Sequence, residues 1–367
     1  MKRFLFLSIL SVLSLTLFSG VKNIDKPMKG EWNLQLEKVW EVKEAGEDLL
    51  AQPMNLQVTK DGIVFLYDRK YSKSYIFDKD GRLKRTFAPK GEGPGEIKIH
   101  MSSYLAPDAY VISDFERLHY FNFNGDFLYS VPNLFFRRKP DIFLSRDVII
   151  SCPVNVDNLK ETKVAVRKIN LKTNEAQVIV EYEMWTGGSI AMEGLPRREI
   201  RIRGLSPMMI LGKGDNRFFY GFNDTYEITV CDLNGKKINF FSVDREKTSI
   251  TIAQKKEILS GYDNTPEIVF KYLMKNFPVE RTYFHCIEEH GGMIYVFVPG
   301  HPLPRLRLPP QIDIFSGDGK YLYKTSINLG EGLILGSNVF LGEFLYTLAW
   351  NEDGDAKLVK YKIKPPK

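Results

Sequence analysis

Apolar and polar residues alternate along most of this chain, in short runs that predict β-strands rather than helices. Several runs repeat one phrase, in which a strand passes through an Asp-Gly or Asn-Gly dipeptide into a second strand. These dipeptides accept positive φ and predict the tight primed turns of β-hairpins. A degenerate copy has Thr173-Asn174 at its turn. The clear copies are "SYIFDKDGRLKRTF" (Ser74 to Phe87), "LHYFNFNGDFLYSV" (Leu118 to Val131), "YEITVCDLNGKKINFF" (Tyr226 to Phe241) and "IDIFSGDGKYLYKT" (Ile312 to Thr325).

A further apolar pair precedes each phrase, as in "MNLQVTKDGIVFLYD" and "MMILGKGDNRFFYGF". The repeating unit is therefore four antiparallel strands, and six such units predict an all-β, six-bladed β-propeller spanning residues 34–363. The last unit has only three strands, while the N-terminal "LEKVWEV" (Leu36 to Val42) has no partner. We expect that strand to complete the last blade, because this removes two unpaired strand edges.

A helical insertion is expected at residues 250–277, between blades four and five. Thr265, Pro266 and Glu267 form a helix start signal, and Gly261 suits the end of a preceding helix. The apolar face of this segment could pack on the propeller itself or form a cap that binds a partner.

The phrase "PKGEGPGEI" (89–97), followed by a strand pair and the "FNFNGDFLYSV" hairpin, resembles NHL-type repeats. A hairpin with a DxxGK phrase, "CDLNGKKINFFSV", then leads into the helical segment. Over residues 34–363 the chain thus resembles a bacterial family of secreted six-bladed β-propellers, built on a domain of unknown function. The resemblance implies the fold and almost nothing about function. Many relatives carry a lipobox cysteine, which this chain lacks.

The glycine-rich stretch "KGEGPGEI" (90–97) lies between two predicted strands. A phosphate-binding loop needs a following helix and a Lys-Ser/Thr pair after its last glycine. Here Glu96 and then a strand follow Gly95. The stretch is therefore predicted to be a corner between two blades.

The first twenty residues, "MKRFLFLSILSVLSLTLFSG", have the basic start, apolar core and small final residues of a secretory signal peptide. An uncleaved N-terminal anchor is the alternative. We therefore expect a periplasmic or extracellular protein with no stable membrane span after removal of the signal, and not a lipoprotein.

The net charge of +6 over 367 residues includes two basic residues of the signal. Such a small excess does not favour nucleic-acid binding. Cys152, Cys231 and Cys286 lie far apart, in strand-like runs and without metal-binding spacing, so we expect buried free thiols. We expect a monomer without cofactors.

Catalytic and metal sites are not evident. His285 and His290 flank two glutamates, but residues five apart on a strand point to opposite faces, so no metal site is predicted. Asp68 and Asp114 end equivalent strands and are expected to cap the following turns. The inner strands are poor in metal-ligand residues. No Ser-His-Asp set or carboxylate pair stands out, although sequence distance leaves open one that assembles across blades.

Arginines cluster in three loops that the blade order places on one face of the propeller. They predict a basic mouth for an anionic glycan or phosphorylated headgroup, with solvated rim charges as the alternative. We therefore expect an extracytoplasmic binding module, for an anionic glycan or a protein partner. The alternatives are a hydrolase or lyase with a site at the central channel, and a structural partner in an envelope complex. The predicted ligand-binding residues are Arg137, Arg138, Arg197, Arg201, Arg203, Arg305 and Arg307.

Overall fold

The computed structural model describes residues 20–133, 142–152, 163–183, 189–192, 195–199, 207–260, 267, 271, 277–299, 311–329 and 333–366. Residues 1–19 of the predicted signal peptide and most of the predicted second helix lie outside these residues. Strands dominate the described chain, and the helical insertion begins with helix α1 (Ile252–Ser260). Thr251 caps α1, because its Oγ1 accepts the Gln254 amide and the Gln254 side chain accepts the Thr251 amide.

The strands form antiparallel sets of four that are consecutive in the chain. The first set is β5 (Pro53–Val58), β6 (Val64–Asp68), β7 (Lys73–Phe77) and β8 (Leu83–Phe87). The second is β9 (Ser102–Ala106), β10 (Ala109–Ser113), β11 (Arg117–Phe121) and β12 (Phe127–Pro132). The third is β13 (Ile142–Phe143), β14 (Val148–Ser151), β15 (Lys163–Asn170) and β16 (Ala176–Glu183).

The later sets follow the same order. One is β19 (Met209–Lys213), β20 (Arg217–Phe222), β21 (Glu227–Asp232) and β22 (Lys237–Asp244), and the next is β23 (Cys286–His290), β24 (Met293–Val298), β25 (Gln311–Ser316) and β26 (Tyr321–Ser326). The last comprises β27 (Ile334–Leu341), β28 (Phe344–Trp350) and β29 (Ala356–Ile363), joined by β2 (Leu36–Val42). Two small hairpins stand apart, β3 (Glu44–Ala45) with β4 (Asp48–Leu49), and β17 (Ser189–Met192) with β18 (Leu195–Glu199).

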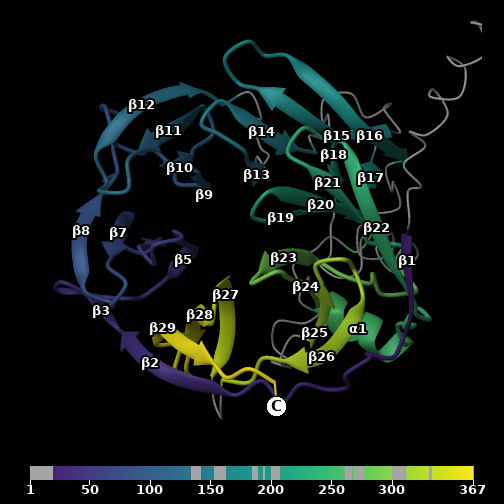
Figure 1. The fold of residues 1–367 in the computed structure, drawn as a ribbon. Coiled ribbons are helices and arrows are strands. Elements are labelled where there is room, and N and C mark those ends of the chain that lie inside the picture. Colours follow the sequence, from purple (N-terminus) through teal and green to yellow (C-terminus); the bar gives the residue numbers. More distant parts are fainter. Residues whose placement is uncertain are drawn as a thin grey trace, which may run out of the picture.

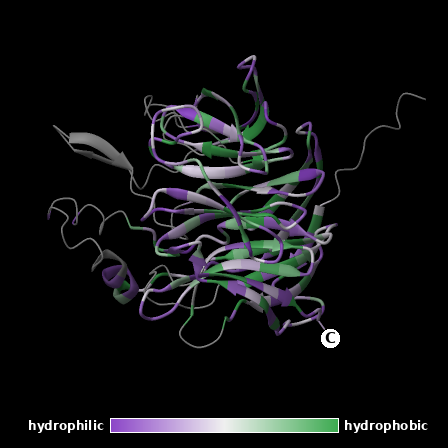
Figure 2. Cartoon of the chain, turned by 90° about the vertical axis from the view of Figure 1, so that its left-hand side faces the viewer, coloured by the Kyte–Doolittle hydropathy of each residue, from purple (hydrophilic) through white to green (hydrophobic). Residues whose placement is uncertain are grey.

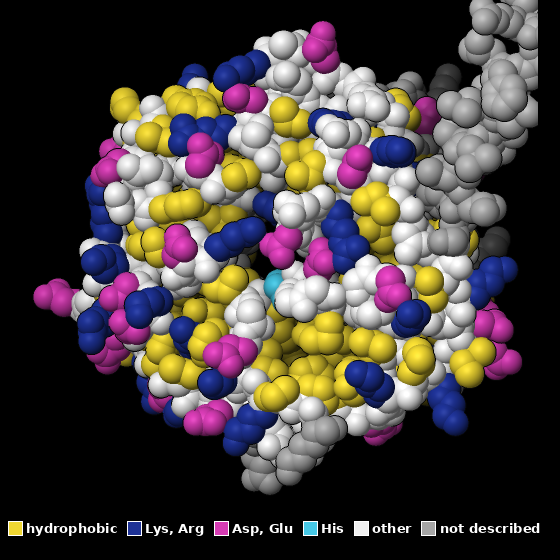
Figure 3. All heavy atoms as spheres, in the orientation of Figure 1, with side chains coloured by type: hydrophobic (Ala, Val, Ile, Leu, Met, Phe, Trp, Pro, Cys, Tyr) yellow, Lys and Arg dark blue, Asp and Glu magenta, His cyan; other side chains and the backbone are white. Residues whose placement is uncertain are grey.

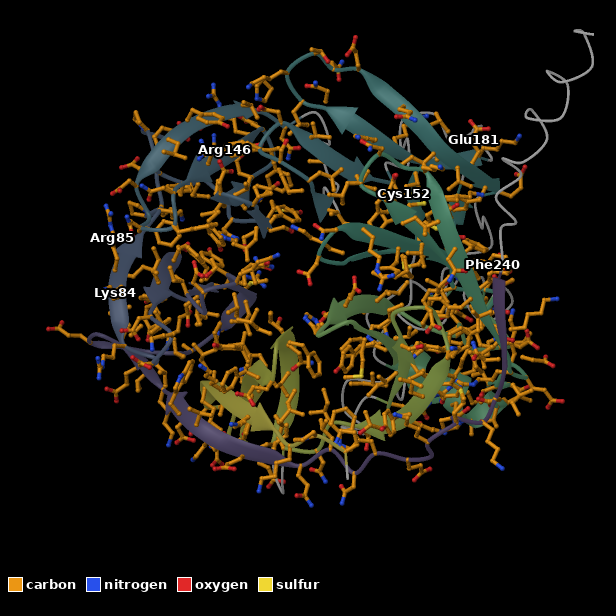
Figure 4. The ribbon with its side chains drawn as sticks, in the orientation of Figure 1. Lys84, Arg85, Arg146, Cys152, Glu181 and Phe240 are labelled. Atoms are coloured by element: carbon orange, nitrogen blue, oxygen red, sulfur yellow. The ribbon has the colours of Figure 1, made fainter. Side chains whose placement is uncertain are left out.

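The sets are arranged in a ring, with the first strand of each set nearest the centre (Figure 1). The first strands contact one another in the order β27, β5, β9, β13, β19 and β23. The fourth strands lie on the outer rim, where Lys84 and Arg85 of β8 and Glu181 of β16 are found (Figure 4). This arrangement is a β-propeller, which confirms the predicted fold class.

The N-terminal segment runs along the outside of the ring. Strand β1 (Gly20–Ile24) pairs in parallel with β22, and β2 pairs antiparallel with β29. Between them, the Met28 and Trp32 amides donate to carbonyls of Tyr321 and Lys324 on β26, at 2.9 and 2.8 Å. The predicted pairing of the N-terminal strand with the last set is therefore confirmed, and the segment also covers the outer edges of two further sets.

The repeated hairpin turns share one backbone geometry. In each clear copy the glycine has positive φ, from 83° at Gly81 to 92° at Gly319, and Asn174 has φ 57° in the degenerate copy. The residue before each of these glycines does not have positive φ, so the predicted primed turns are wrong. Each clear copy also carries a register shift at the strand end, which is the pattern of a glycine bulge beside a longer turn.

The predicted corner at residues 90–97 is a loop between β8 and β9 in which backbone amides donate hydrogen bonds to acceptors of the same loop. The Gly91 amide donates to the Ile97 carbonyl, and the Gly93 amide donates to the Glu96 carboxylate at 2.8 Å. Gly95 has φ 80°, and a Cβ there would meet Phe127 at 3.0 Å. The loop is therefore held by internal hydrogen bonds and packs against the next set.

The core lies between neighbouring sets, where aromatic side chains interdigitate. Phe65 of β6 stacks on Tyr110 of β10 with ring centroids 4.3 Å apart, and Phe87 packs edge-on against both Tyr110 and Phe121. Similar clusters fill the other junctions. Figure 2 shows the hydrophobic stretches within the strands of the stacked sheets. Contact between sets therefore provides much of the buried apolar area.

A buried ion pair lies among the aromatic side chains of this core. Asp313 of β25 is fully buried and accepts hydrogen bonds from Arg245 at 2.7 Å, Tyr226 at 2.6 Å and Tyr321 at 2.7 Å. The Arg245 guanidinium also binds Asp25 in the N-terminal segment. Burial of Tyr226 and the nearby Asp313 carboxylate raise the pKa of the Tyr226 hydroxyl well above its usual range. The cluster joins β25, β26, the N-terminal segment and the residues that directly precede β21 and follow β22.

Replacing Arg245 should destabilise the protein strongly, because it leaves the Asp313 carboxylate buried without its cation. For Arg245→Met we expect a loss of about 3–5 kcal/mol in the free energy of unfolding, measured by denaturant titration. Arg85→Met is the matched control, since Arg85 pairs with Asp126 on the exposed rim. The control should unfold like the wild type, and equal losses in both variants would contradict this role of Arg245.

Candidate functional site

The predicted arginine face cannot be assembled from the described chain. Arg137, Arg138, Arg201, Arg203, Arg305 and Arg307 lie outside the described residues. Arg197 lies in strand β18, which pairs only with β17 among the described strands. The arginine face therefore remains a prediction, and polar groups of the described residues gather elsewhere.

A different cluster of charged residues lies at one end of the central channel, where the first and second strands of each set are joined. We call it the channel mouth and define it as Lys60, Lys213, Asp215, Glu288 and His290. Figure 3 shows basic, acidic and histidine side chains around the centre of the ring. Lys213 ends β19, and its backbone forms a single parallel bridge to Glu288 of β23. The first strands of two neighbouring sets therefore touch here.

The Lys213 ammonium reaches across the ring to other first strands. Its Nζ donates to the Phe143 carbonyl of β13 at 3.1 Å and lies 3.5 Å from the Leu105 carbonyl of β9. Within the described residues no carboxylate forms an ion pair with this ammonium. Burial lowers the pKa of Lys213, and the positive charge of Lys60 lowers it further. Among the described residues, the Lys213 ammonium is thus a cation in the channel that contacts backbone carbonyls and no carboxylate.

A second contact spans the channel mouth. Lys60, in the β5–β6 turn, binds Asp215, in the β19–β20 turn, with Nζ and Oδ1 3.1 Å apart. Strands β9 and β13 separate β5 from β19 on one side of the ring, so this pair bridges it. Both side chains are well exposed, at 82% and 67%, and such pairs contribute little stability. A ligand could therefore displace this contact at small cost.

The acidic side of the channel mouth comes from β23. His290 Nε2 lies 3.0 Å from the Glu288 carboxylate, and both side chains are partly buried. Glu289 faces the other way and binds Arg217 of β20, which also donates to the Gly317 carbonyl at 2.8 Å. The Glu288–His290 pair therefore belongs to the channel mouth, whereas the Glu289–Arg217 pair links two neighbouring sets.

The expectation that inner strands lack polar ligands was therefore incomplete. The sequence run "CIEEH" is the first strand of its set, so alternation places Glu288 and His290 on one face. Within the described ranges no group of three or more His, Cys, Asp or Glu residues has metal-binding geometry.

The predicted capping role is confirmed for Asp68, which accepts the Ala51 and Lys70 amides, and for Asp114, which accepts the Glu116 and Arg117 amides.

None of the three cysteines, all of which the structure describes, forms a disulfide, as predicted. Cys231 is fully buried, and burial raises the pKa of its thiol to about 12. Cys152 and Cys286 are only partly buried, so the prediction of buried thiols holds in full for Cys231 alone. A thiolate at Cys231 is therefore disfavoured at neutral pH.

Near the opposite end of the first strands, His100 lies just before β9 and stacks on Tyr67. The ring centroids are 3.8 Å apart, and His100 Nδ1 lies 3.2 Å from the Asn55 side-chain amide. His100 Nε2 is buried without a hydrogen-bond partner among the described residues. Asn55 has φ 56°, within a register shift of β5. Burial lowers the pKa of His100 to about 3, so its ring is neutral at physiological pH.

The buried His100 predicts a pH dependence of stability. Its pKa is lower in the folded protein than in the unfolded chain, so the unfolded chain binds more protons between pH 6.5 and 3. Stability should therefore fall with acidification through this window. From pH 6.5 to 4.5, with a folded pKa of about 3, wild type should lose about 2 kcal/mol more unfolding free energy than His100→Gln. Parallel pH profiles of the two proteins would contradict the assignment.

The comparisons with known proteins concern the fold. No protein-family model matches the chain, and no curated protein sequence is detectably similar. A solved structure of a Bacteroides fragilis protein described as exported aligns over 94% of this chain and 99% of its own, with 13% identity and a TM-score of 0.53. A member of the DUF4221 family from Bacteroides vulgatus aligns over 92% and 100%, with 13% identity and a TM-score of 0.54. At this identity the likeness shows the fold alone.

Among the described residues, no helix has the length and apolar character needed to cross a membrane.

Proposed function

We propose that this protein is an exported six-bladed β-propeller that binds an anionic ligand at the channel mouth, with Lys213 as the main anchor. The observation that supports the proposal most is the position of the Lys213 ammonium, which enters the channel and contacts two carbonyls but no described carboxylate. An anionic group from a ligand would supply the missing countercharge. Charge-assisted hydrogen bonds of this kind are among the stronger ones in proteins.

The neighbouring contacts suit binding of an acidic glycan. Lys60 lies near enough to lower the pKa of Lys213, so two cations can face one anionic group. Asp215 competes for Lys60 only through an exposed pair. Glu288 and His290 add hydrogen-bonding groups on the other side. Sugar hydroxyl groups can pair with such carboxylate and imidazole groups while a uronic-acid carboxylate contacts the lysines.

The export of the protein is part of the same proposal. It is supported by the signal-like first twenty residues and by the fold shared with a Bacteroides fragilis protein described as exported. Each set of four strands would be one blade, with β2 completing the last. No cysteine directly follows the apolar N-terminal run, so we propose export without lipid attachment.

The arginine face remains a second proposed position for the anionic ligand, or for a protein partner. It is supported only by the sequence, because the arginines of this face lie outside the described residues or, for Arg197, in an isolated hairpin. A hydrolase or lyase at the channel is the rival function, and the Glu288–His290 pair is the observation in its favour. Turnover of a glycan that is lost in Glu288→Gln would favour the rival.

The test of the proposal is binding of a uronic-acid oligosaccharide, measured by titration calorimetry. Lys213→Met should weaken binding by about 10- to 100-fold, because it removes one charge-assisted contact while keeping most of the side-chain volume. The matched control is Lys84→Met, on the outer rim, which should bind like wild type. Equal affinity of Lys213→Met and wild type, with binding lost in Arg197→Ser/Arg201→Ser/Arg203→Ser, would move the site to the arginine face.

The lowered pKa of Lys213 adds a pH signature. Because the ammonium loses its proton at a lower pH than an ordinary lysine, affinity should decline on the alkaline side before lysines on the rim titrate. The comparison is the affinity of wild type and Lys213→Met between pH 7 and pH 10, a range chosen around the usual lysine pKa of about 10.4. A decline of the same size in both proteins would show that another group is responsible.

A further inference from the structure

A chain of hydrogen bonds joins a serine, a histidine and an aspartate on the second set of strands. Ser130 Oγ lies 3.0 Å from His119 Nδ1, and His119 Nε2 lies 2.9 Å from Asp114 Oδ2. Asp114 follows β10, His119 lies on β11, and Ser130 lies on β12 directly opposite His119. The cluster is on the rim side of the set and is separate from the channel mouth.

The hydrogen bonds determine the form of the histidine. A carboxylate only accepts hydrogen bonds, so His119 Nε2 carries a proton and donates it to Asp114. In a neutral ring Nδ1 then has a free lone pair, which accepts the hydroxyl hydrogen of Ser130. This is the order of roles in a serine nucleophile, its base and the carboxylate that orients the base, with the two ring nitrogens exchanged.

The aspartate is fixed independently of the histidine. Asp114 Oδ1 accepts the Glu116 and Arg117 amides at 2.7 and 2.6 Å, which leaves Oδ2 for His119. Asp114 and His119 are 8% and 6% exposed, whereas Ser130 is only partly buried. The orienting carboxylate and the base are therefore shielded from water, while the hydroxyl lies closer to the surface.

The fold does not require these residues at these places. Five sets have a register shift between their third and fourth strands, and this shift gives a common reference for comparing positions. The residues at the position of His119 in the other four are Tyr75, Ala165, Thr229 and Asp313. The residues opposite them, equivalent to Ser130, are Thr86, Glu181, Phe240 and Lys324. Among these aligned sets, the combination of serine and histidine is found in the second.

The surroundings of Ser130 indicate the class of substrate. Strand β12 is the outermost of its sheet, and no described strand pairs with its free edge. Leu128 and Pro132, two residues to either side of Ser130, are both exposed, Leu128 at 37%. The strand contains no charged residue. A neutral substrate with a short apolar acyl group matches these neighbours.

We propose that Ser130, His119 and Asp114 form a serine-nucleophile site that hydrolyses esters of short-chain carboxylic acids. Ser130 Oγ bonds to the ester carbonyl carbon as His119 Nδ1 takes the hydroxyl proton. The bond from that carbon to the alcohol oxygen then breaks, and His119 returns the proton to the departing alcohol. Water attacks the acyl-serine, gives a proton to His119, and releases the carboxylic acid as Ser130 regains its hydrogen. Asp114 is the positioning residue.

The first test is labelling of the purified protein with a fluorophosphonate, followed by peptide mass spectrometry. The fluorophosphonate should form an adduct on Ser130 with loss of fluoride. Ser130→Ala and His119→Gln should give no adduct while unfolding at the wild-type temperature, which separates loss of reactivity from loss of fold. Thr86→Ala is the matched control, because Thr86 occupies the equivalent position on β8 opposite Tyr75. It should be labelled on Ser130 like wild type.

The second readout is hydrolysis of p-nitrophenyl butyrate. Ser130→Ala should lower the rate by about 10³-fold or to the uncatalysed background, whereas Thr86→Ala should leave it unchanged. Hydrolysis that persists in Ser130→Ala, an adduct on a different serine, or an unlabelled wild-type protein would each overturn the proposal. Ester hydrolysis and binding of the uronic-acid oligosaccharide are measured separately, so failure of this proposal and failure of the channel-mouth proposal are distinguishable.

Discussion

The pairing of β2 with β29 is the constraint on which the rest of this structure depends. A ring of separate sheets needs a contact that joins its first and last sets. Without such a contact, strand edges at the join would be left unpaired. Here residues 36–42 supply the outer strand of a sheet whose other strands come from residues 334–363. The join is made of backbone hydrogen bonds and so depends little on side-chain identity.

The N-terminal segment extends this join around the rim. It pairs with β22 through β1, crosses β26 through main-chain bonds, and reaches the buried Arg245–Asp313 pair through Asp25. That pair is surrounded by aromatic and aliphatic side chains, so its charges are costly unless both partners are present. The N-terminal segment that joins the ring therefore also supplies Asp25, a second carboxylate for the buried Arg245.

The rigid ring in turn positions both candidate sites. Lys213 reaches the channel because β19 ends there and the neighbouring first strands offer carbonyl groups to its ammonium. Ser130 meets His119 because the β11–β12 register places them opposite each other. One site uses the inner edge of the sheets and the other the outer edge, so a single scaffold could support binding and hydrolysis independently.

Most of the fold was predictable from periodicity, because alternation and the repeated glycine turns directly reflect strand pairing. The primed turn type was wrong, since one extra residue before Gly81 and its equivalents changes the geometry without changing the Asp-Gly signature. The sites were harder to predict. Lys213 is an ordinary lysine in the sequence, and its contacts come from strands 70 and 108 residues away. The Ser130–His119 contact was within reach, because pairing across the Asn124-Gly125 turn brings both residues together.

The most direct measurement is a crystal structure of the protein with a bound uronic-acid oligosaccharide. The account predicts a ligand carboxylate within hydrogen-bond distance of Lys213 Nζ, with the Lys60–Asp215 contact opened or shared. An oligosaccharide bound only at the arginine face, with Lys213 still held by the Leu105 and Phe143 carbonyls, would contradict it.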